Sequence, residues 1–233
     1  MKIIKNEKLI KRNRIIGQWT TIAALLILGG GLYISMTNSE NPELVTYSLV
    51  ALAVGFILTQ VGMYFGNRWG RSPRPDENLD AGLKGLPNEF SIYHYVTPAS
   101  HLLVGPAGVW ALIPYRQRGV VTYQRNRWRI GGGGFLQAYM SIFGQEGIGR
   151  PDLEAEAEIK AVKKLFSKSL EENEIPNVQA ALIFMNEAAE IQAEDAPLPA
   201  LKLNQLKGFL RQKVKEKLIA QTQLAAVKAA LPE

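Results

Sequence analysis

Two long stretches near the N-terminus contain no Asp, Glu, Lys or Arg, and they constrain the fold more than any other feature of the chain. They cover residues 15–36 and 44–67, with a short connection at residues 37–43. An α-helix rises about 1.5 Å per residue, so roughly 20 apolar residues cross a hydrocarbon core of about 30 Å. Each stretch reaches that length. The sequence therefore predicts two transmembrane helices joined by an external loop.

The charges beside these stretches predict their orientation, because Lys and Arg close to a span are retained in the cytoplasm. Residues 1–14 hold six basic side chains and one Glu, and residues 68–75 hold three Arg, whereas residues 37–43 hold two Glu and no basic side chain. We expect a multi-pass protein of the plasma or inner membrane, with a basic cytoplasmic tail at 1–14, a linker at 68–75 and both termini in the cytoplasm. A cleaved signal peptide is the alternative for the first stretch, although its apolar core is usually only about 7–15 residues long.

Two further patterns accompany the predicted helices. Aromatic side chains lie near the ends of the spans, where such rings reach headgroup depth, at Trp19, Tyr33, Tyr47, Tyr64 and Trp69. Residues without a Cβ atom, which let two helices approach, occur at Gly29, Gly30, Gly31, Gly55 and Gly62. These glycines are either the contact between the two helices or ordinary residues of membrane helices.

Composition excludes several kinds of chemistry. The chain has no Cys and only two His, His94 and His101, which excludes disulfides, thiolate metal sites, cysteine nucleophiles and histidine-rich metal sites. Residues 76–233 are enough for one compact cytoplasmic domain. The formal net charge of +6 fits either anionic lipid or nucleic acid as a partner. We expect no bound cofactor.

The apolar pattern of residues 76–233 predicts an α/β fold. A helix is expected to begin near residue 76, and short runs rich in β-branched and aromatic residues follow it. An amphipathic helix is predicted at 152–172, a buried strand at 178–185 and a long amphipathic helix at 201–231. This order of helix, several strands, helix, strand and helix is typical of a mixed sheet flanked by helices.

The middle of the chain resembles the nuclease-related domain, NERD, of bacterial proteins. The matching residues are 101–115 (HLLVGPAGVWALIPY) and 119–121 (GVV), and the likeness extends over about residues 76–211. In that family an Asp precedes the histidine, and the strand after the Gly-Pro turn ends in Glu-x-Lys. The family is similar to restriction-endonuclease-like nucleases, whose Asp and Glu-x-Lys hold a divalent metal and activate water. The resemblance therefore implies a restriction-endonuclease-like mixed sheet.

Carried over residue by residue, the catalytic positions lack the catalytic side chains. Ser100 stands at the Asp position, Ile113 at the Glu position and Tyr115 at the Lys position. Magnesium needs hard oxygen ligands, and Ser and Ile offer no carboxylate. The resemblance thus implies a pseudoenzyme, a membrane-anchored binding or scaffolding module without a metal site. One alternative is a structural membrane-assembly protein. The other is a membrane-tethered metal-dependent nuclease with displaced ligands, such as Asp76, Glu77, Glu89 or Glu146.

An arginine cluster is the best candidate for a binding surface. It lies within residues 116–129, which contain no acid, and consists of Arg116, Arg118, Arg125, Arg127 and Arg129. Tyr115, Tyr123 and Trp128 accompany it. Arginine forks suit phosphate and aromatic rings stack on bases, so the cluster fits anionic lipid or nucleic acid. A solvated strand edge protected by charge is the third interpretation. A protein partner or a second copy of the chain would use the membrane hairpin or the C-terminal helix.

Overall fold

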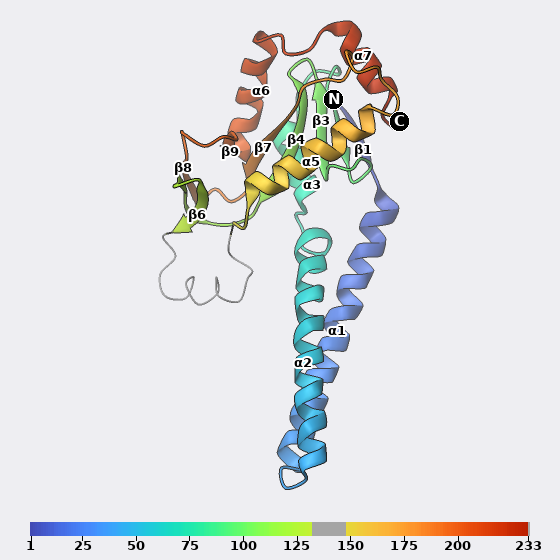
Figure 1. Cartoon of the computed structure of the whole chain (residues 1–233), viewed down its shortest axis with the longest axis vertical. Coiled ribbons are helices and arrows are strands. Elements are labelled where there is room, and N and C mark those ends of the chain that lie inside the picture. Colours follow the sequence, from blue (N-terminus) through green and yellow to red (C-terminus); the bar gives the residue numbers. More distant parts are fainter. Residues whose placement is uncertain (132–147, 233) are drawn as a thin grey trace. The chain divides into compact units, whose positions relative to one another are not determined.

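The computed structural model describes residues 1–131 and 148–232 (Figure 1). The chain forms two compact units. One consists of Asn6–Arg74, and the other combines Met1–Lys5 with Pro75–Glu233. The first five residues therefore fold with the part of the chain that follows the apolar helices. Glu146, one of the alternative metal ligands, lies outside the described residues.

The unit Asn6–Arg74 is a helical hairpin (Figure 1). Helix α1 spans Glu7–Thr37 and α2 spans Pro42–Phe65, and a short π-helical turn, η1, follows at Gly66–Gly70. Asn6 and Asn41 cap the two long helices, because their side chains accept hydrogen bonds from backbone N–H groups of the first turn. Residues 7–14, which we expected as part of a basic tail, are helical.

Both long helices have the length and composition needed to cross a membrane. Of the 18 residues in the most apolar part of each, 17% are buried in α1 and 11% in the helix that begins at Pro42. The core helix of a soluble protein is mostly buried, so these helices expose far more apolar surface than such a helix does. The expected pair of long apolar helices in hairpin contact is confirmed.

Close approach between α1 and α2 depends on glycine. A Cβ atom at Gly31 would lie 2.9 Å from the Cβ of Ala51, and one at Gly55 would lie 2.6 Å from the side chain of Leu28. Real Cβ atoms do not approach other atoms so closely, so a larger residue at either position would force the helices to shift. Of the two interpretations of the glycines, contact between the helices therefore applies to Gly31 and Gly55.

The other glycines divide between this contact and open surface. Gly62 lies against Thr21, and Gly17, which the sequence analysis did not single out, lies against the end of α2. Gly29 and Gly30 have no neighbouring atom within 4 Å of the position of a Cβ, among the described residues. Successive residues of a helix point in different directions, so glycines adjacent to Gly31 lie off the contact face.

Most of the predicted interfacial aromatic side chains are exposed. They are Trp19, Tyr33, Tyr47 and Tyr64. Trp69, in η1, is buried instead, with its ring centroid 5.2 Å from that of Phe65 and the Arg68 guanidinium above its ring. Trp69 therefore differs from the other four aromatic residues in being covered by protein.

The second unit contains a mixed sheet. Its strands are β1 (Lys2–Lys5), β2 (Ser91–His94), β3 (His101–Gly105), β4 (Gly108–Tyr115), β7 (Val178–Phe184) and β9 (Ala200–Lys202). In the described part of the chain the strand order is β1-β2-β3-β4-β7-β9. Strands β2, β3 and β4 are antiparallel neighbours, whereas β1 runs parallel to β2, and β7 runs parallel to both β4 and β9.

A smaller sheet packs beside this one. Its strands are β5 (Gly119–Gln124), β6 (Arg127–Gly131) and β8 (Ala189–Gln192), in the order β6-β5-β8 within the described residues. Arg125 and Asn126 connect β5 to β6 with φ angles of 51° and 60°. Positive φ at both central residues is typical of the type I′ turn, whose twist matches that of a two-residue hairpin.

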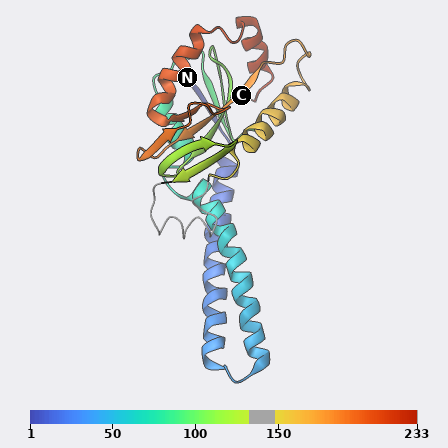
Figure 2. The ribbon, with the colours of Figure 1, turned by 60° about the vertical axis from the view of Figure 1, so that its left-hand side comes forward.

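Helices cover both faces of the larger sheet (Figure 2). They are α3 (Pro75–Leu83), α5 (Pro151–Phe166), α6 (Leu206–Lys215) and α7 (Gln221–Ala229). Ile113 and Tyr115 of β4 pack in the core that includes α5 and α7, whereas Trp110 and Leu112 pack in the core that includes α3 and α6. Burial on both faces explains why β4 reads as an unbroken apolar run.

The expected α/β fold, with mixed sheets and helices, is confirmed. The long helix expected at residues 201–231 is wrong. Residues 201–231 are not a single helix, because they include the end of β9, a 3₁₀ turn at Leu203–Gln205 (η2), α6 and α7. Lys217, just beyond α6, has a φ of 50°, which an α-helix cannot accommodate. The chain turns there before α7 begins.

Candidate functional site

The three positions that the resemblance aligns with catalytic residues lie at one end of β3 and β4. The register pairs Leu102 with Ala111, and continuing it by two residues places Ser100 opposite Ile113. Tyr115 follows two residues later on the same face of β4, because alternate residues of a strand share a face. The structure therefore brings Ser100, Ile113 and Tyr115 together.

Helix α5 contacts this end of the sheet through two carboxylates. The hydroxyl of Tyr115 donates a hydrogen bond to Glu154 Oε2 at 2.9 Å. The backbone N–H of Ser100 donates to Glu158 Oε1 at 3.2 Å. Glu154 and Glu158 are four residues apart and therefore lie on one face of α5. Two of the three positions are thus bonded to the helix that covers them.

Tyr115 is a buried hydrogen-bond donor. Its side chain is 7% exposed and stacks on Phe184, with 5.5 Å between the ring centroids. Burial, followed by the negative charge of Glu154, raises the pKa of Tyr115 well above its ordinary value, so the phenol keeps its proton at neutral pH. A neutral phenol and the buried side chain of Ile113 supply neither a metal ligand of the carboxylate type nor a cation for a developing phosphorane.

The sequence analysis did not single out Glu154 or Glu158. The signal available was a spacing of four residues between acids on an amphipathic helix. Solvated helix faces carry the same spacing, so only the tertiary structure distinguishes these two carboxylates from Asp152 and Glu156.

Among the described residues, the structure does not gather the alternative ligands Asp76, Glu77 and Glu89 into a metal site. Within residues 1–131 and 148–232, no three His, Asp or Glu side chains are grouped so that they could hold a metal ion. Asp76 is fully buried, and its Oδ2 atom lies 3.0 Å from Lys5 Nζ. Glu77 and Glu89 do not join it in such a group.

A buried polar cluster joins β1, α3, β2 and β3. It consists of Lys5, Asp76, Asp80, His94 and His101. Lys5 pairs with both Asp76 and Asp80. The Nε2 atom of His94 lies 3.0 Å from Asp80 Oδ1, and its Nδ1 atom lies 2.7 Å from His101 Nδ1. Both imidazole rings are at most 1% exposed.

The ionised state of Asp80 determines the direction of its hydrogen bond with His94. Burial alone would raise the pKa of Asp80, but hydrogen bonds from His94 and Lys5 outweigh burial and hold that pKa below its ordinary value. Asp80 is therefore an ionised acceptor, and His94 Nε2 is a donor. The Nδ1 atoms of His94 and His101 share the next hydrogen bond of the cluster. The two histidines are buried, hydrogen-bonded parts of the core, not exposed catalytic bases.

Lys5 has the complementary protonation. Burial alone would lower its pKa, but the hydrogen bonds and negative charges of Asp80 and Asp76 outweigh burial and raise that pKa above its ordinary value. Lys5 is the last residue of β1, and α1 begins two residues later. Asp76 and Asp80 belong to α3, which follows the helical hairpin. These ion pairs therefore connect the chain before the hairpin with the chain after it.

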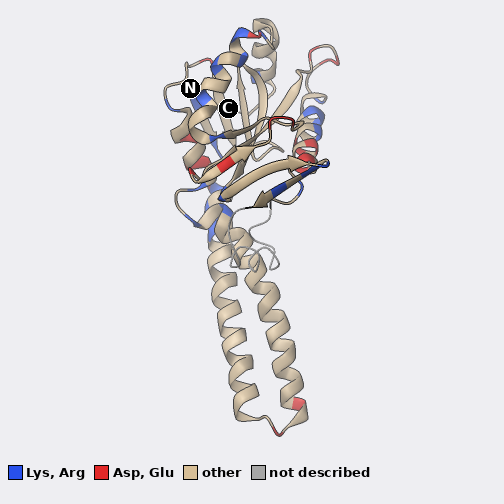
Figure 3. Cartoon of the chain, turned by 90° about the vertical axis from the view of Figure 1, so that its left-hand side faces the viewer, with Lys and Arg blue, Asp and Glu red and all other residues tan. Residues whose placement is uncertain are grey.

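The predicted arginine cluster is divided by the smaller sheet. Arg125 lies in the turn between β5 and β6, and Arg127 and Arg129 lie on β6. All three residues are exposed. Figure 3 colours the Lys and Arg positions of the ribbon blue. Arg116 and Arg118 precede β5 and so lie at the opposite end of that strand from the turn. The structure thus brings Arg125, Arg127 and Arg129 together and separates the other two from them.

The aromatic residues that accompany the arginines are buried or packed. Trp128 is 5% exposed, and its ring centroid lies 5.2 Å from that of Tyr123, its partner in the β5–β6 register. Tyr115 belongs to the core described above. The expectation that these rings could stack on bases is therefore not met by Trp128 or Tyr115, because their faces are covered by protein.

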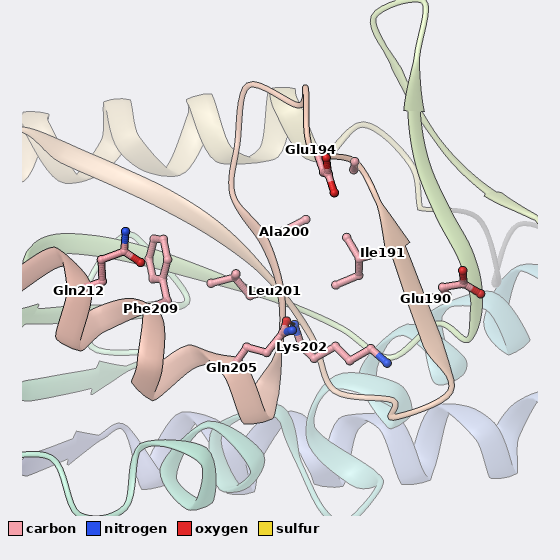
Figure 4. Close-up of a pocket in the computed structure, with 10 residues that line it drawn as sticks. Glu190, Ile191, Glu194, Ala200, Leu201, Lys202, Gln205, Phe209 and Gln212 are labelled. Atoms are coloured by element: carbon pink, nitrogen blue, oxygen red, sulfur yellow. Dashed lines mark hydrogen bonds between the residues drawn. The ribbon is translucent and has the colours of Figure 1, made fainter.

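An open cavity of about 590 Å³ lies between β8, β9 and α6 (Figure 4). Phe209, Leu201 and Ile191 form apolar parts of its lining, and Lys202, Glu190 and Glu194 contribute charged side chains. The ammonium group of Lys202 donates to the carbonyl oxygen of Glu187 at 3.1 Å. The lining has no His or Cys, and its mixed character does not select one class of ligand.

Comparisons with protein-family models, with curated proteins and with solved structures gave no match. The functional argument therefore depends on the residues and geometry described above.

Proposed function

We propose that this chain is a membrane-anchored, catalytically inactive nuclease-related domain that acts as a binding or scaffolding module. The observation that carries the proposal is the pair of hydrogen bonds from Tyr115 to Glu154 and from Ser100 to Glu158. The resemblance assigns the metal site of the family to these positions, and in this chain we propose that they serve packing between a sheet and a helix instead. The mixed sheet with helices on both faces is compatible with that family's fold.

Membrane attachment is supported by the hairpin and by the position of β1. The two apolar helices contact each other and expose most of their apolar surface. Strand β1 precedes α1, and α3 follows α2, yet both belong to one folded unit. A hairpin that inserts in a bilayer must therefore have both ends on the same side. The basic residues at those ends favour the cytoplasmic side of the plasma or inner membrane.

The absence of catalysis is tested on the full-length protein in detergent. Magnesium and manganese are titrated by calorimetry, and the same sample is assayed for cleavage of single- and double-stranded DNA. We expect neither metal binding nor cleavage.

A double variant, Glu154→Gln with Glu158→Gln, makes the test specific, and Glu156→Gln on the same helix is its matched control. Metal-dependent cleavage that the double variant loses and the control keeps would establish the displaced-ligand nuclease and replace this proposal.

A further inference from the structure

We propose that the exposed face of β6 binds the phosphate headgroups of anionic lipid in the bilayer that holds the hairpin. The inference rests on the membrane attachment proposed above. It assigns a partner, anionic lipid, to Arg125, Arg127 and Arg129, and we call these three residues the arginine face. It separates these three residues from Arg116 and Arg118, to which it assigns no lipid contact.

The geometry of the β5–β6 hairpin presents this face to solvent. Arg127 and Arg129 alternate with buried Trp128, so their side chains lie on the side of the sheet opposite to it. Their partners across the hairpin are Gln124 and Thr122, which carry no charge. The arginine face therefore combines guanidinium groups with neutral polar side chains.

In the described part of the chain, no ion pair competes for these guanidinium groups. Among residues 1–131 and 148–232, none of Arg125, Arg127 and Arg129 forms a salt bridge. Glu190 of β8 points to the same side of the sheet, but β5 separates it from β6, and it accepts a hydrogen bond from Gln192. With strands about 4.8 Å apart, Glu190 lies roughly 10 Å from the line of β6. The face thus carries a positive charge that an anion from outside can match.

The burial of the aromatic rings favours lipid over nucleic acid. Proteins that bind single strands without sequence preference stack bases on exposed aromatic side chains. Trp128 is covered by protein, so the arginine face offers charge and guanidinium forks without a stacking platform. Lipid headgroups need only the phosphate contact, which arginine makes in bidentate form. The chain is also joined to the apolar hairpin at both Lys5 and Pro75, which keeps the face in the presence of lipid.

The test uses the full chain in nanodiscs with a single fluorescent label. The protein has no native Cys, so Gln124→Cys places one dye beside Arg127. Discs of neutral phosphatidylcholine are compared with discs that contain phosphatidylglycerol, and both carry a spin-labelled headgroup that quenches the dye at short range. We expect quenching in the anionic discs, little in the neutral discs, and a decrease at high salt because screening weakens exposed charge pairs.

A matched pair of variants separates the arginine face from net charge. Arg127→Gln with Arg129→Gln should lower the ratio of docked to undocked domain by about 25-fold, since each basic side chain near an anionic surface contributes about fivefold. Lys160→Gln with Lys164→Gln removes the same charge from exposed positions on α5 and should keep the quenching. Circular dichroism and the melting temperature verify that both variants are folded.

Several results would overturn the inference. They are equal quenching in neutral and anionic discs, quenching that survives the loss of Arg127 and Arg129, and quenching that the α5 variant loses equally. Binding of an oligonucleotide that depends on Arg127 and Arg129, without lipid-dependent quenching, would assign the face to nucleic acid instead. Failure of the chain to insert in discs would contradict the proposed attachment before any quenching is measured, so the two failures are distinct.

Discussion

Lys5 forms the ion pairs that join β1 to α3. It pairs with Asp76, which is fully buried, and with Asp80, which also accepts from His94. Removing one partner of a buried ion pair costs far more than an exposed pair contributes. The position of Lys5 at the end of β1 makes this residue a sensitive probe of whether β1 belongs to the sheet.

The variant Lys5→Met should lower the free energy of unfolding by about 3 kcal/mol, because Asp76 and Asp80 lose a cation in a buried site. Thermal and chemical unfolding in detergent, followed by circular dichroism, measure the change. Lys8→Met, at an exposed position on α1, is the control and should change stability by less than about 0.5 kcal/mol. Equal stability of the two variants would show that Lys5 does not hold β1 to α3.

The same cluster predicts the pH dependence of stability. The folded pKa of Asp80 lies below its ordinary value of about 3.9, so its contribution is present above that pH and is lost as pH falls through the folded pKa. The folded pKa of Lys5 lies above its ordinary value of about 10.4, so its contribution is fully present below that pH and is lost as pH rises through the folded pKa. Unfolding measured from pH 3 to pH 11 should lose stability at both ends, and Lys5→Met should flatten the alkaline decrease. An alkaline decrease that Lys5→Met leaves intact would assign it to another group.

At the scale of elements, the contact between α1 and α2 gives a test with an internal control. Gly62→Leu places a side chain against Thr21, where no space exists, and should lower the free energy of unfolding by about 2 kcal/mol. Gly30→Leu adds the same side chain to open surface and should be nearly neutral. Melting temperatures of both variants in one detergent decide the matter. If Gly30→Leu were the more damaging change, the faces of α1 would be wrongly assigned.

Elements with a long periodic signal were predictable from the sequence, and short or tertiary features were not. The apolar stretches, β4 and β7 follow directly from burial of consecutive or alternating apolar residues. Strand β1 was missed because Lys2–Lys5 has too few residues for a pattern and lies in a basic segment. At the candidate site, Ser100, Ile113 and Tyr115 were identified by resemblance, but their bonds to Glu154 and Glu158 depend on how α5 packs. The register of the β5–β6 hairpin, which the sequence did not predict, determines which arginines share a face.

At the scale of the whole molecule, the interrupted domain predicts a folding requirement. A fragment of residues 75–233 lacks β1, which exposes the edge of β2 and removes Lys5 from Asp76 and Asp80. We expect it to melt at a lower temperature and to associate more than a chain in which a Gly-Ser linker replaces Asn6–Arg74 and joins Lys5 to Pro75. Circular dichroism and size-exclusion chromatography compare the two proteins. A fragment as stable and as monomeric as the linked chain would show that β1 is dispensable.

The central claim is a hairpin inserted in the membrane with both of its ends on the cytoplasmic side. Because the chain has no Cys, single-Cys proteins can report on each side of the membrane. Ser39→Cys lies in the loop between α1 and α2, and Glu172→Cys lies in the domain on the opposite side. We predict that a membrane-impermeant maleimide labels the Ser39→Cys protein in intact cells, and labels the Glu172→Cys protein only after the membrane is opened. Labelling of both proteins in intact cells, labelling of neither, or recovery of the chain in the soluble fraction would contradict this account.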